Sequence, residues 1–177
     1  MAQEGLVSVA SRHSAPETMA RLLAALEKRD LAVFARIDHA ANAAAVGMPL
    51  RPTEVVLFGN PKGGTVLMQD QQRAGIDLPL KALVWQDADS KVWLSYNATE
   101  WIAARAGLGP ASAAAVSAMA KALAAIAEEA TKKVAADRFI RHHRAWPFKE
   151  GRRFAHLRAP WCMLACRLHG LPNQVRQ

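Results

Sequence analysis

The sequence predicts an α+β domain in which helices cover one face of a mostly antiparallel sheet. Short apolar runs bounded by Gly, Pro, Asn and Asp predict strands, and apolar residues at helical spacing between them predict helices. Two of the runs, 80–86 and 91–96, are joined by only four turn residues and therefore form a hairpin. A hairpin argues against a parallel doubly wound sheet. The predicted order of the main elements is β-α-β-β-α-β-β-α.

The first half of the chain supplies three strands and a capped helix. Residues 6–10 alternate large and small side chains, which predicts the first strand. Ser14-Ala-Pro-Glu17 resembles a capping box with Pro in the first turn, so a helix is expected to begin there. The second strand is expected over 31–38 and the third over 55–61, with a short helix-prone stretch at 40–46 between them.

The second half begins with a turn cluster at 59–64, after which Thr65 is expected to cap a helix. Pro79 lacks an N–H and therefore belongs at the first residue of a strand or on an edge. Trp85 and Trp93 flank the hairpin turn and are expected to pair across it, as core or interface packing in preference to a ligand-stacking wall. The chain from 112 onward predicts a long Ala-rich helix.

Charge divides the chain into two parts. Residues 1–131 carry 12 basic and 13 acidic side chains, whereas residues 132–177 carry 11 basic and 2 acidic ones. We therefore expect one near-neutral domain over 1–131 and a basic C-terminal extension over 132–177 that is partly helical or disordered. Arg and aromatic residues alternate in this extension, so it is the one place where nucleic-acid binding is an alternative. Its composition favours disorder without a role.

Composition narrows the chemistry of the 1–131 domain. It has no cysteine and only two histidines, His13 and His39, which excludes a thiolate nucleophile and argues against a metal site. No cofactor is expected. The N-terminus lacks the basic start and apolar block of a secretory signal, and the apolar run near 113–127 is interrupted by Ser117 and Lys121. These features predict a cytoplasmic protein without a membrane segment.

Asp38 and His39 end the second predicted strand and are the first candidate site. Neighbours in a strand point to opposite faces, so the two cannot share a proton as a simple dyad. One interpretation places His39 in a pocket as a general acid, a general base or a ligand contact. The favoured interpretation makes Asp38 the cap of the following turn and His39 a structural contact.

The turn at 59–65 is the second candidate site. Free N–H groups, a helix N-terminus and the ammonium group of Lys62 together suit a small anion, although the spacing is not that of a P-loop. A plain strand-to-helix turn is the favoured alternative. Because this turn and His39 both follow strands, we expect one cleft to contain both. The candidate ligand-binding residues are Asp38, His39, Asn60, Lys62, Gly63, Gly64 and Thr65.

The order and spacing of several short motifs resemble the bacterial and archaeal domain-of-unknown-function family 302. The motifs are Phe34–His39, Gly47, Leu50–Pro52, Leu57–Pro61, Gly64–Met68, Asp77–Leu80 and the strand from Val92 to Tyr96. The resemblance covers about residues 6–128 and implies the TATA-box-binding-protein-like class of α+β fold and a homodimer. It implies no established reaction. Ser90 departs from the family's usual Gly, which costs little if the turn does not require positive φ there.

Three functions follow from these observations. The preferred one is a homodimer that binds a small molecule or small anion in a cleft between sheet and helices. The second is a small enzyme that uses His39 as general acid or base on an anionic substrate, so whether the protein is an enzyme stays open. The third is nucleic-acid contact through the basic extension.

Overall fold

The computed structural model describes residues 5–132, which contain a five-stranded sheet with helices against one face. The strand order is β1-β5-β4-β3-β2, and every neighbouring pair is antiparallel. The predicted α+β class and the order of the main elements are confirmed. The strands are β1 (Leu6–Ala10), β2 (Ala32–Asp38), β3 (Thr53–Gly59), β4 (Leu80–Gln86) and β5 (Val92–Asn97).

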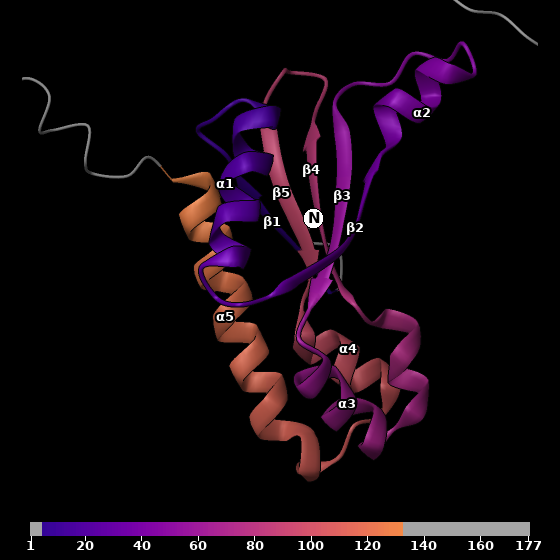
Figure 1. The fold of residues 1–177 in the computed structure, drawn as a ribbon, viewed down its shortest axis with the longest axis vertical. Helices are drawn as coiled ribbons and strands as arrows, with labels where there is room; N and C mark the ends of the chain where they lie inside the picture. The colour runs from indigo at the N-terminus through magenta and orange to yellow at the C-terminus, as the bar shows by residue number, and fades with distance from the viewer. Residues whose placement is uncertain (1–4, 133–177) are drawn as a thin grey trace, which may run out of the picture. The chain divides into compact units, whose positions relative to one another are not determined.

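Two helices lie side by side against the sheet, and three shorter ones lie at its ends (Figure 1). The pair against the sheet is α1 and α5. The helices α3 and α4 lie together at one end of the strands, and α2 lies at the opposite end (Figure 1). The helices are α1 (Ala15–Glu27), α2 (His39–Ala45), α3 (Pro61–Asp70), α4 (Thr99–Ala106) and α5 (Ala113–Thr131), with 3-10 turns at Gln72–Asp77 and Pro110–Ser112.

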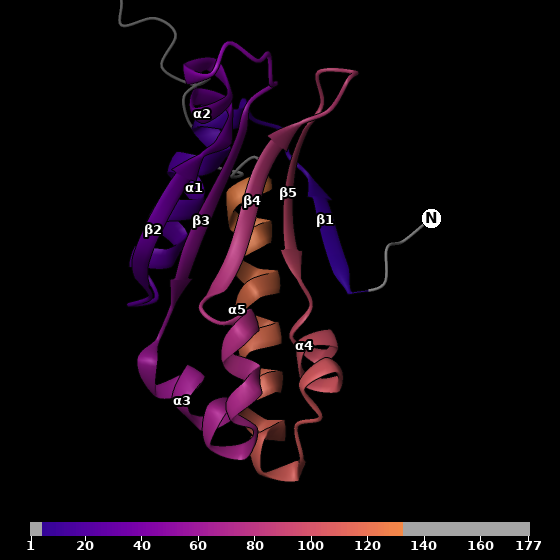
Figure 2. The same ribbon diagram turned by 90° about the vertical axis from the view of Figure 1, so that its right-hand side faces the viewer.

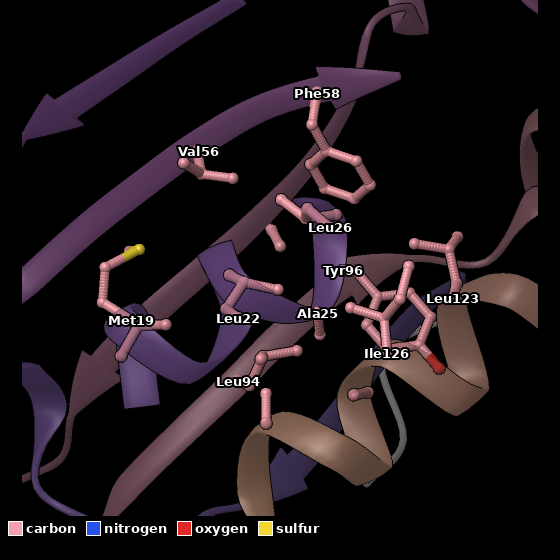
Figure 3. Close-up of a cluster of buried hydrophobic side chains, with 14 of the residues drawn as sticks. Met19, Leu22, Ala25, Leu26, Val56, Phe58, Leu94, Tyr96, Leu123 and Ile126 are labelled. Carbon is pink, nitrogen blue, oxygen red and sulfur yellow. The ribbon is translucent and has the colours of Figure 1, made fainter. Parts of the chain in front are cut away.

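The core lies between α1, α5 and the covered face of the sheet. Leu22 and Leu26 of α1 and Phe58 of β3 lie in one cluster, which Leu123 and Ile126 of α5 complete (Figure 3). All five side chains are buried. Burial of one such side chain stabilises the fold by about 1.5–3 kcal/mol, so this cluster holds α1 and α5 against the strands.

The helix start at Ser14 is confirmed. The Ser14 Oγ accepts a hydrogen bond from the backbone N–H of Glu17 at 3.4 Å, and Pro16 lies in the first turn, where no N–H partner is lost. The side chains of Met19, Leu22 and Leu26 then recur on the buried face of α1. Local capping and the apolar stripe therefore agree on this helix, which is why the sequence located it.

The hairpin turn between β4 and β5 is organised by one carboxylate. Asp87 Oδ1 accepts from the N–H groups of Asp89 and Lys91, and its Oδ2 accepts from the Trp93 indole at 2.7 Å. These bonds, the Trp93 bond above all, lower the pKa of the Asp87 carboxyl group. Ser90 has φ +62°, so the condition under which its departure from Gly would cost little is not met. The left-handed conformation is why Gly suits the position.

No described helix covers the other face of the sheet (Figure 2). The strand register places apolar side chains on this face. Trp85 and Trp93 pair across the hairpin as predicted, with ring centroids 6.2 Å apart and ring planes 20° apart. The strand register places further apolar residues beside them on this face. We call this surface the open face, and it comprises Ile37, Val55, Leu57, Leu83, Trp85 and Trp93.

One helix among the described residues, Pro110–Thr131, is long and apolar enough to cross a membrane by length and composition. The expectation that Ser117 and Lys121 make this run too short was therefore wrong. One face of the helix nevertheless packs in the core, where Leu123, Ile126 and Ala127 are buried.

The structure does not test the predicted basic extension over 132–177. Of these residues, only Lys132 lies within the described part of the chain, so the predicted boundary at 131 and the character of the extension stay predictions.

Candidate functional site

A cavity of about 660 Å³ lies where α3 and α5 meet the end of the sheet at Gly59. Its size falls within the range of about 300–1,000 Å³ that is usual for small-molecule sites. Most of the lining side chains are apolar. The lining residues are Leu31, Phe34, Phe58, Gly59, Asn60, Pro61, Lys62, Gly63, Gly64, Thr65, Met68, Leu78, Pro79, Leu80, Ala118, Met119, Ala122, Leu123 and Ile126.

The first turn of α3 forms one wall of this cavity. The helix begins at Pro61, so the expectation that Thr65 caps it was wrong. Asn60 is the cap instead: its Oδ1 accepts from the Lys62 N–H at 2.9 Å, and its carbonyl accepts from the Gly64 N–H at 3.1 Å. Pro61 needs no hydrogen-bond partner for its nitrogen at the first helical position. An Asn-Pro pair is therefore the signal that locates this helix start.

Small residues let α3 approach α5 closely. A Cβ atom on Gly63 would lie 3.0 Å from the Met119 Cε, whereas one on Gly64 would make an ordinary contact with Leu78 at 3.7 Å. On α5, Ala118 and Ala122 are spaced one turn apart and both line the cavity. Small side chains on both helices therefore leave the space that the surrounding Phe, Leu and Met side chains enclose.

The polar groups at the cavity come from the same first turn of α3. Among the described residues that line the cavity, Lys62 is the one that carries a charge, and its side chain is exposed. The N–H groups of Lys62 and Gly64 are already used in the cap of α3. The predicted anion cradle therefore loses two of its donors, and what remains is an apolar cavity with a cation at its rim.

Of the predicted ligand-binding residues, the structure brings Asn60, Lys62, Gly63, Gly64 and Thr65 together at this cavity. Asp38 and His39 lie elsewhere. Ala32 pairs with Gly59 and Asp38 pairs with Glu54, so Asp38 is roughly 17 Å along the strands from Gly59. The expectation of one shared cleft was therefore wrong, because the C-terminal ends of antiparallel neighbours lie at opposite ends of the sheet, as measured along the strands.

Asp38 caps α2 and His39 is its first residue, at the end of the strands away from Gly59. The Asp38 Oδ1 accepts from the Ala41 N–H at 2.9 Å, which is the capping role favoured from the sequence. The His39 side chain is exposed. A second cavity of about 360 Å³ lies nearby and is lined by Arg36, Asp38 and Glu54, but His39 does not line it. Arg36 and Glu54 form an ion pair at 2.6 Å, so their charges already satisfy each other.

An apolar cleft between sheet and helices was expected from the sequence, but the side chains that line it were not identified. Phe34 and Met68 lie on a strand and a helix that were each predicted, but their shared cavity depends on how those elements pack. Likewise, an Ala-rich helix does not reveal which of its Ala residues face a cavity. Among the described residues, no group of His, Cys, Asp and Glu side chains has the arrangement of a metal site.

A family model described as "Domain of unknown function DUF302" matches residues 7–126. The chain belongs to the DUF302 family. The matched stretch runs from β1 into α5 and includes the residues around the main cavity. A crystal structure described as "uncharacterized conserved protein DUF302 from Bacillus stearothermophilus" has the same fold. It aligns with a TM-score of 0.65 at 18% identity and covers 72% of this chain and 99% of that chain.

Three relatives from Brucella carry the name of a channel. "Fluoride-specific ion channel FluC 1" of Brucella suis biovar 1 and of Brucella abortus biovar 1, and "Fluoride-specific ion channel FluC 2" of Brucella melitensis biotype 1, are each 50% identical over 115 residues. The match covers 65% of this chain but only 43–45% of each relative. The chain thus spans less than half the length of these relatives.

Proposed function

We propose that this DUF302 domain binds a small molecule in the cavity between α3, α5 and the end of the sheet. The observation that carries the proposal is a cavity of about 660 Å³ with a mostly apolar lining and a few polar groups at one wall. That combination is typical of small-molecule sites, in which apolar side chains supply affinity and a few polar groups fix orientation.

A cavity-filling variant tests this proposal. Ala122 of α5 lines the cavity and is only partly buried, so the larger side chain of Ala122→Trp is expected to fill the cavity. Ala125→Trp, at an exposed position of the same helix that does not line the cavity, is the matched control. Native mass spectrometry of the purified full chain is expected to detect a bound small molecule in the wild type and in Ala125→Trp, and to lose it in Ala122→Trp.

The proposal fails if the bound molecule persists in Ala122→Trp at the wild-type occupancy. It also fails if the wild type takes up no member of a broad small-molecule library under the same conditions.

We also propose that the domain forms a homodimer through the open face. Extended apolar patches on a soluble domain mark interaction sites, and a two-fold dimer buries the same patch on both copies. The centre of this face is Leu83, which pairs with Ser95 on one side and Val55 on the other. Leu83→Asp is expected to shift the mass measured by light scattering from dimer to monomer. Ala24→Asp on the exposed side of α1 is the control, and a monomeric wild type would contradict the proposal.

The alternatives receive less support from the geometry. A small anion at 59–65 would compete with the cap of α3 for the N–H groups of Lys62 and Gly64. An enzyme that uses His39 would have to work at an exposed side chain, at the end of the strands opposite the main cavity. Nucleic-acid contact through 132–177 concerns a segment that, apart from Lys132, lies outside the described residues.

For the relatives named fluoride channels, we propose that the shared segment is a ligand-binding module and that conduction belongs to the rest of those proteins. The shared segment is less than half of their length. Within residues 5–132, the one helix of membrane-spanning length has Leu123 and Ile126 in the core. Liposomes loaded with fluoride and reconstituted with this chain are therefore expected to show no efflux above protein-free liposomes. Efflux above that background would refute this assignment.

A further inference from the structure

We propose that the ligand of the main cavity is an aliphatic carboxylate, with its chain among the apolar side chains and its carboxylate at Lys62. This inference rests on the proposed small-molecule site and specifies its ligand class. It is supported by two independent features of the lining, namely the character of the walls and the sign of the charge at the rim.

The walls suit a flexible hydrocarbon chain. Apolar surface comes from three elements, through Phe34 of β2, Phe58 of β3 and Leu123 of α5. Met68 and Met119 lie among them, and the unbranched, polarisable Met side chain adapts to ligands of varying shape. Within the part of the chain that the structure describes, no acidic side chain and no histidine lines the cavity. The lining therefore provides contact area but offers no counter-charge to an ammonium group.

The rim suits a negative charge. Lys62 is the one charged residue of the lining over residues 5–132. Its exposed position lets the ammonium group reach a carboxylate that stays partly in water. An exposed ion pair contributes little to the binding free energy. The hydrocarbon chain of the ligand must therefore supply most of the affinity, and Lys62 supplies the discrimination by charge. The polar side chains of Asn60 and Thr65 lie in the same turn and extend the polar rim.

A ligand series separates these two contributions. Isothermal titration of the full chain with hexanoate, octanoate and decanoate is expected to show affinity rising on the order of tenfold for each added pair of methylenes. Decanoate is expected to bind at least several-fold more tightly than decylamine at low salt. This preference is expected to shrink as the salt concentration rises, because the pair is exposed.

Two variants assign the contributions to residues. Lys62→Gln is expected to remove most of the preference for decanoate over decylamine while keeping the dependence on chain length. Lys121→Gln, an exposed cation on α5 that does not line the cavity, is the control and is expected to behave as wild type. Ala122→Trp is expected to abolish binding of every member of the series.

The outcomes distinguish this inference from the proposed function. Affinity that is independent of chain length, equal binding of decanoate and decylamine, or a preference that survives Lys62→Gln overturns the carboxylate assignment. In each case a different ligand that is lost in Ala122→Trp would leave the small-molecule site standing. If no ligand of any class is sensitive to Ala122→Trp, both proposals fail together.

Discussion

Gly63 of α3 lies against Met119 of α5 so closely that a Cβ atom on Gly63 would stand 3.0 Å from the Met119 Cε. Side-chain Cβ atoms essentially do not approach other atoms more closely than this, so the methyl end of Met119 would have to move. Both residues line the main cavity. The contact therefore links the identity of one residue in α3 to the shape of the proposed ligand site.

Gly63→Ala is expected to separate ligand binding from stability. The new methyl group pushes the flexible end of Met119, which narrows the cavity and lowers ligand affinity several-fold. Replacing Gly by Ala within a helix favours folding by up to about 1 kcal/mol, so the free energy of unfolding should stay level or rise. Titration with the cavity ligand and urea denaturation measure the two effects. Gly64→Ala also adds a methyl group to the cavity lining but is expected to lose less affinity, since its Cβ atom would make only an ordinary 3.7 Å contact with Leu78. Equal loss of affinity in both variants would contradict the role given to Met119.

His39→Ala is expected to change neither ligand binding nor the free energy of unfolding by more than about 0.5 kcal/mol. The side chain is exposed and lies at the end of the sheet away from the cavity. Asp38→Ala should instead lower the free energy of unfolding by about 1 kcal/mol through loss of the cap on α2, and Asp38→Asn should restore most of it. Loss of ligand binding in His39→Ala would instead place the ligand site at the end of the sheet where His39 lies.

The fold was predictable because local signals and the strand pattern agree. The Ser14 cap, the apolar stripe of α1 and the alternating or apolar strands all lie within short windows of sequence. The hairpin between β4 and β5 then fixes one antiparallel pair, and the predicted sheet follows from it. These features depend on neighbours along the chain, which a single sequence displays directly.

The site was predictable only in part, because it depends on contacts between distant segments. The turn at 59–65 was identified by its residue types, and it does line the main cavity. The antiparallel pairing of β2 with β3 places His39 at the end of the strands away from this turn, and residue types cannot show that pairing. Phe34, Met68 and Met119 come from three elements whose packing creates the cavity. A list of polar residues could not have pointed to them.

Ser90→Gly is expected to raise the free energy of unfolding by up to about 1 kcal/mol. Ser90 has φ +62°, a conformation that costs a non-glycine residue about 1–2 kcal/mol. Gly avoids this cost but loses roughly 0.5–1 kcal/mol through the greater freedom of its unfolded chain. Urea denaturation measures the difference. Asp89→Gly in the same turn is the control and should lower stability, because no positive φ is found at Asp89. A stability of Ser90→Gly below that of the wild type would show that the turn tolerates Ser90 without strain.

Stability is expected to fall in acid partly through Glu129, which joins α5 to α1. Its carboxylate accepts from Arg29 at 2.9 Å and from Lys28 at 3.1 Å. The hydrogen bond from Arg29, followed by that from Lys28, lowers the pKa of the Glu129 carboxyl group below its ordinary value of 4.5. A carboxyl group whose pKa is lower in the folded state stabilises the fold above its unfolded pKa, and this contribution is lost as the pH falls through the folded pKa.

Glu129→Gln should therefore be less stable than the wild type at pH 7, and the difference should shrink as the pH falls below about 4.5. The urea midpoints of both proteins, measured from pH 7 down to pH 3, test this expectation. Added salt should reduce the difference at pH 7, because the partners are partly exposed. Glu27→Gln on α1 controls for the loss of one negative charge. A difference in urea midpoint between wild type and Glu129→Gln that stays constant down to pH 3 would contradict this expectation. It would show that the loss of stability comes from packing at this position and not from the ionised carboxylate.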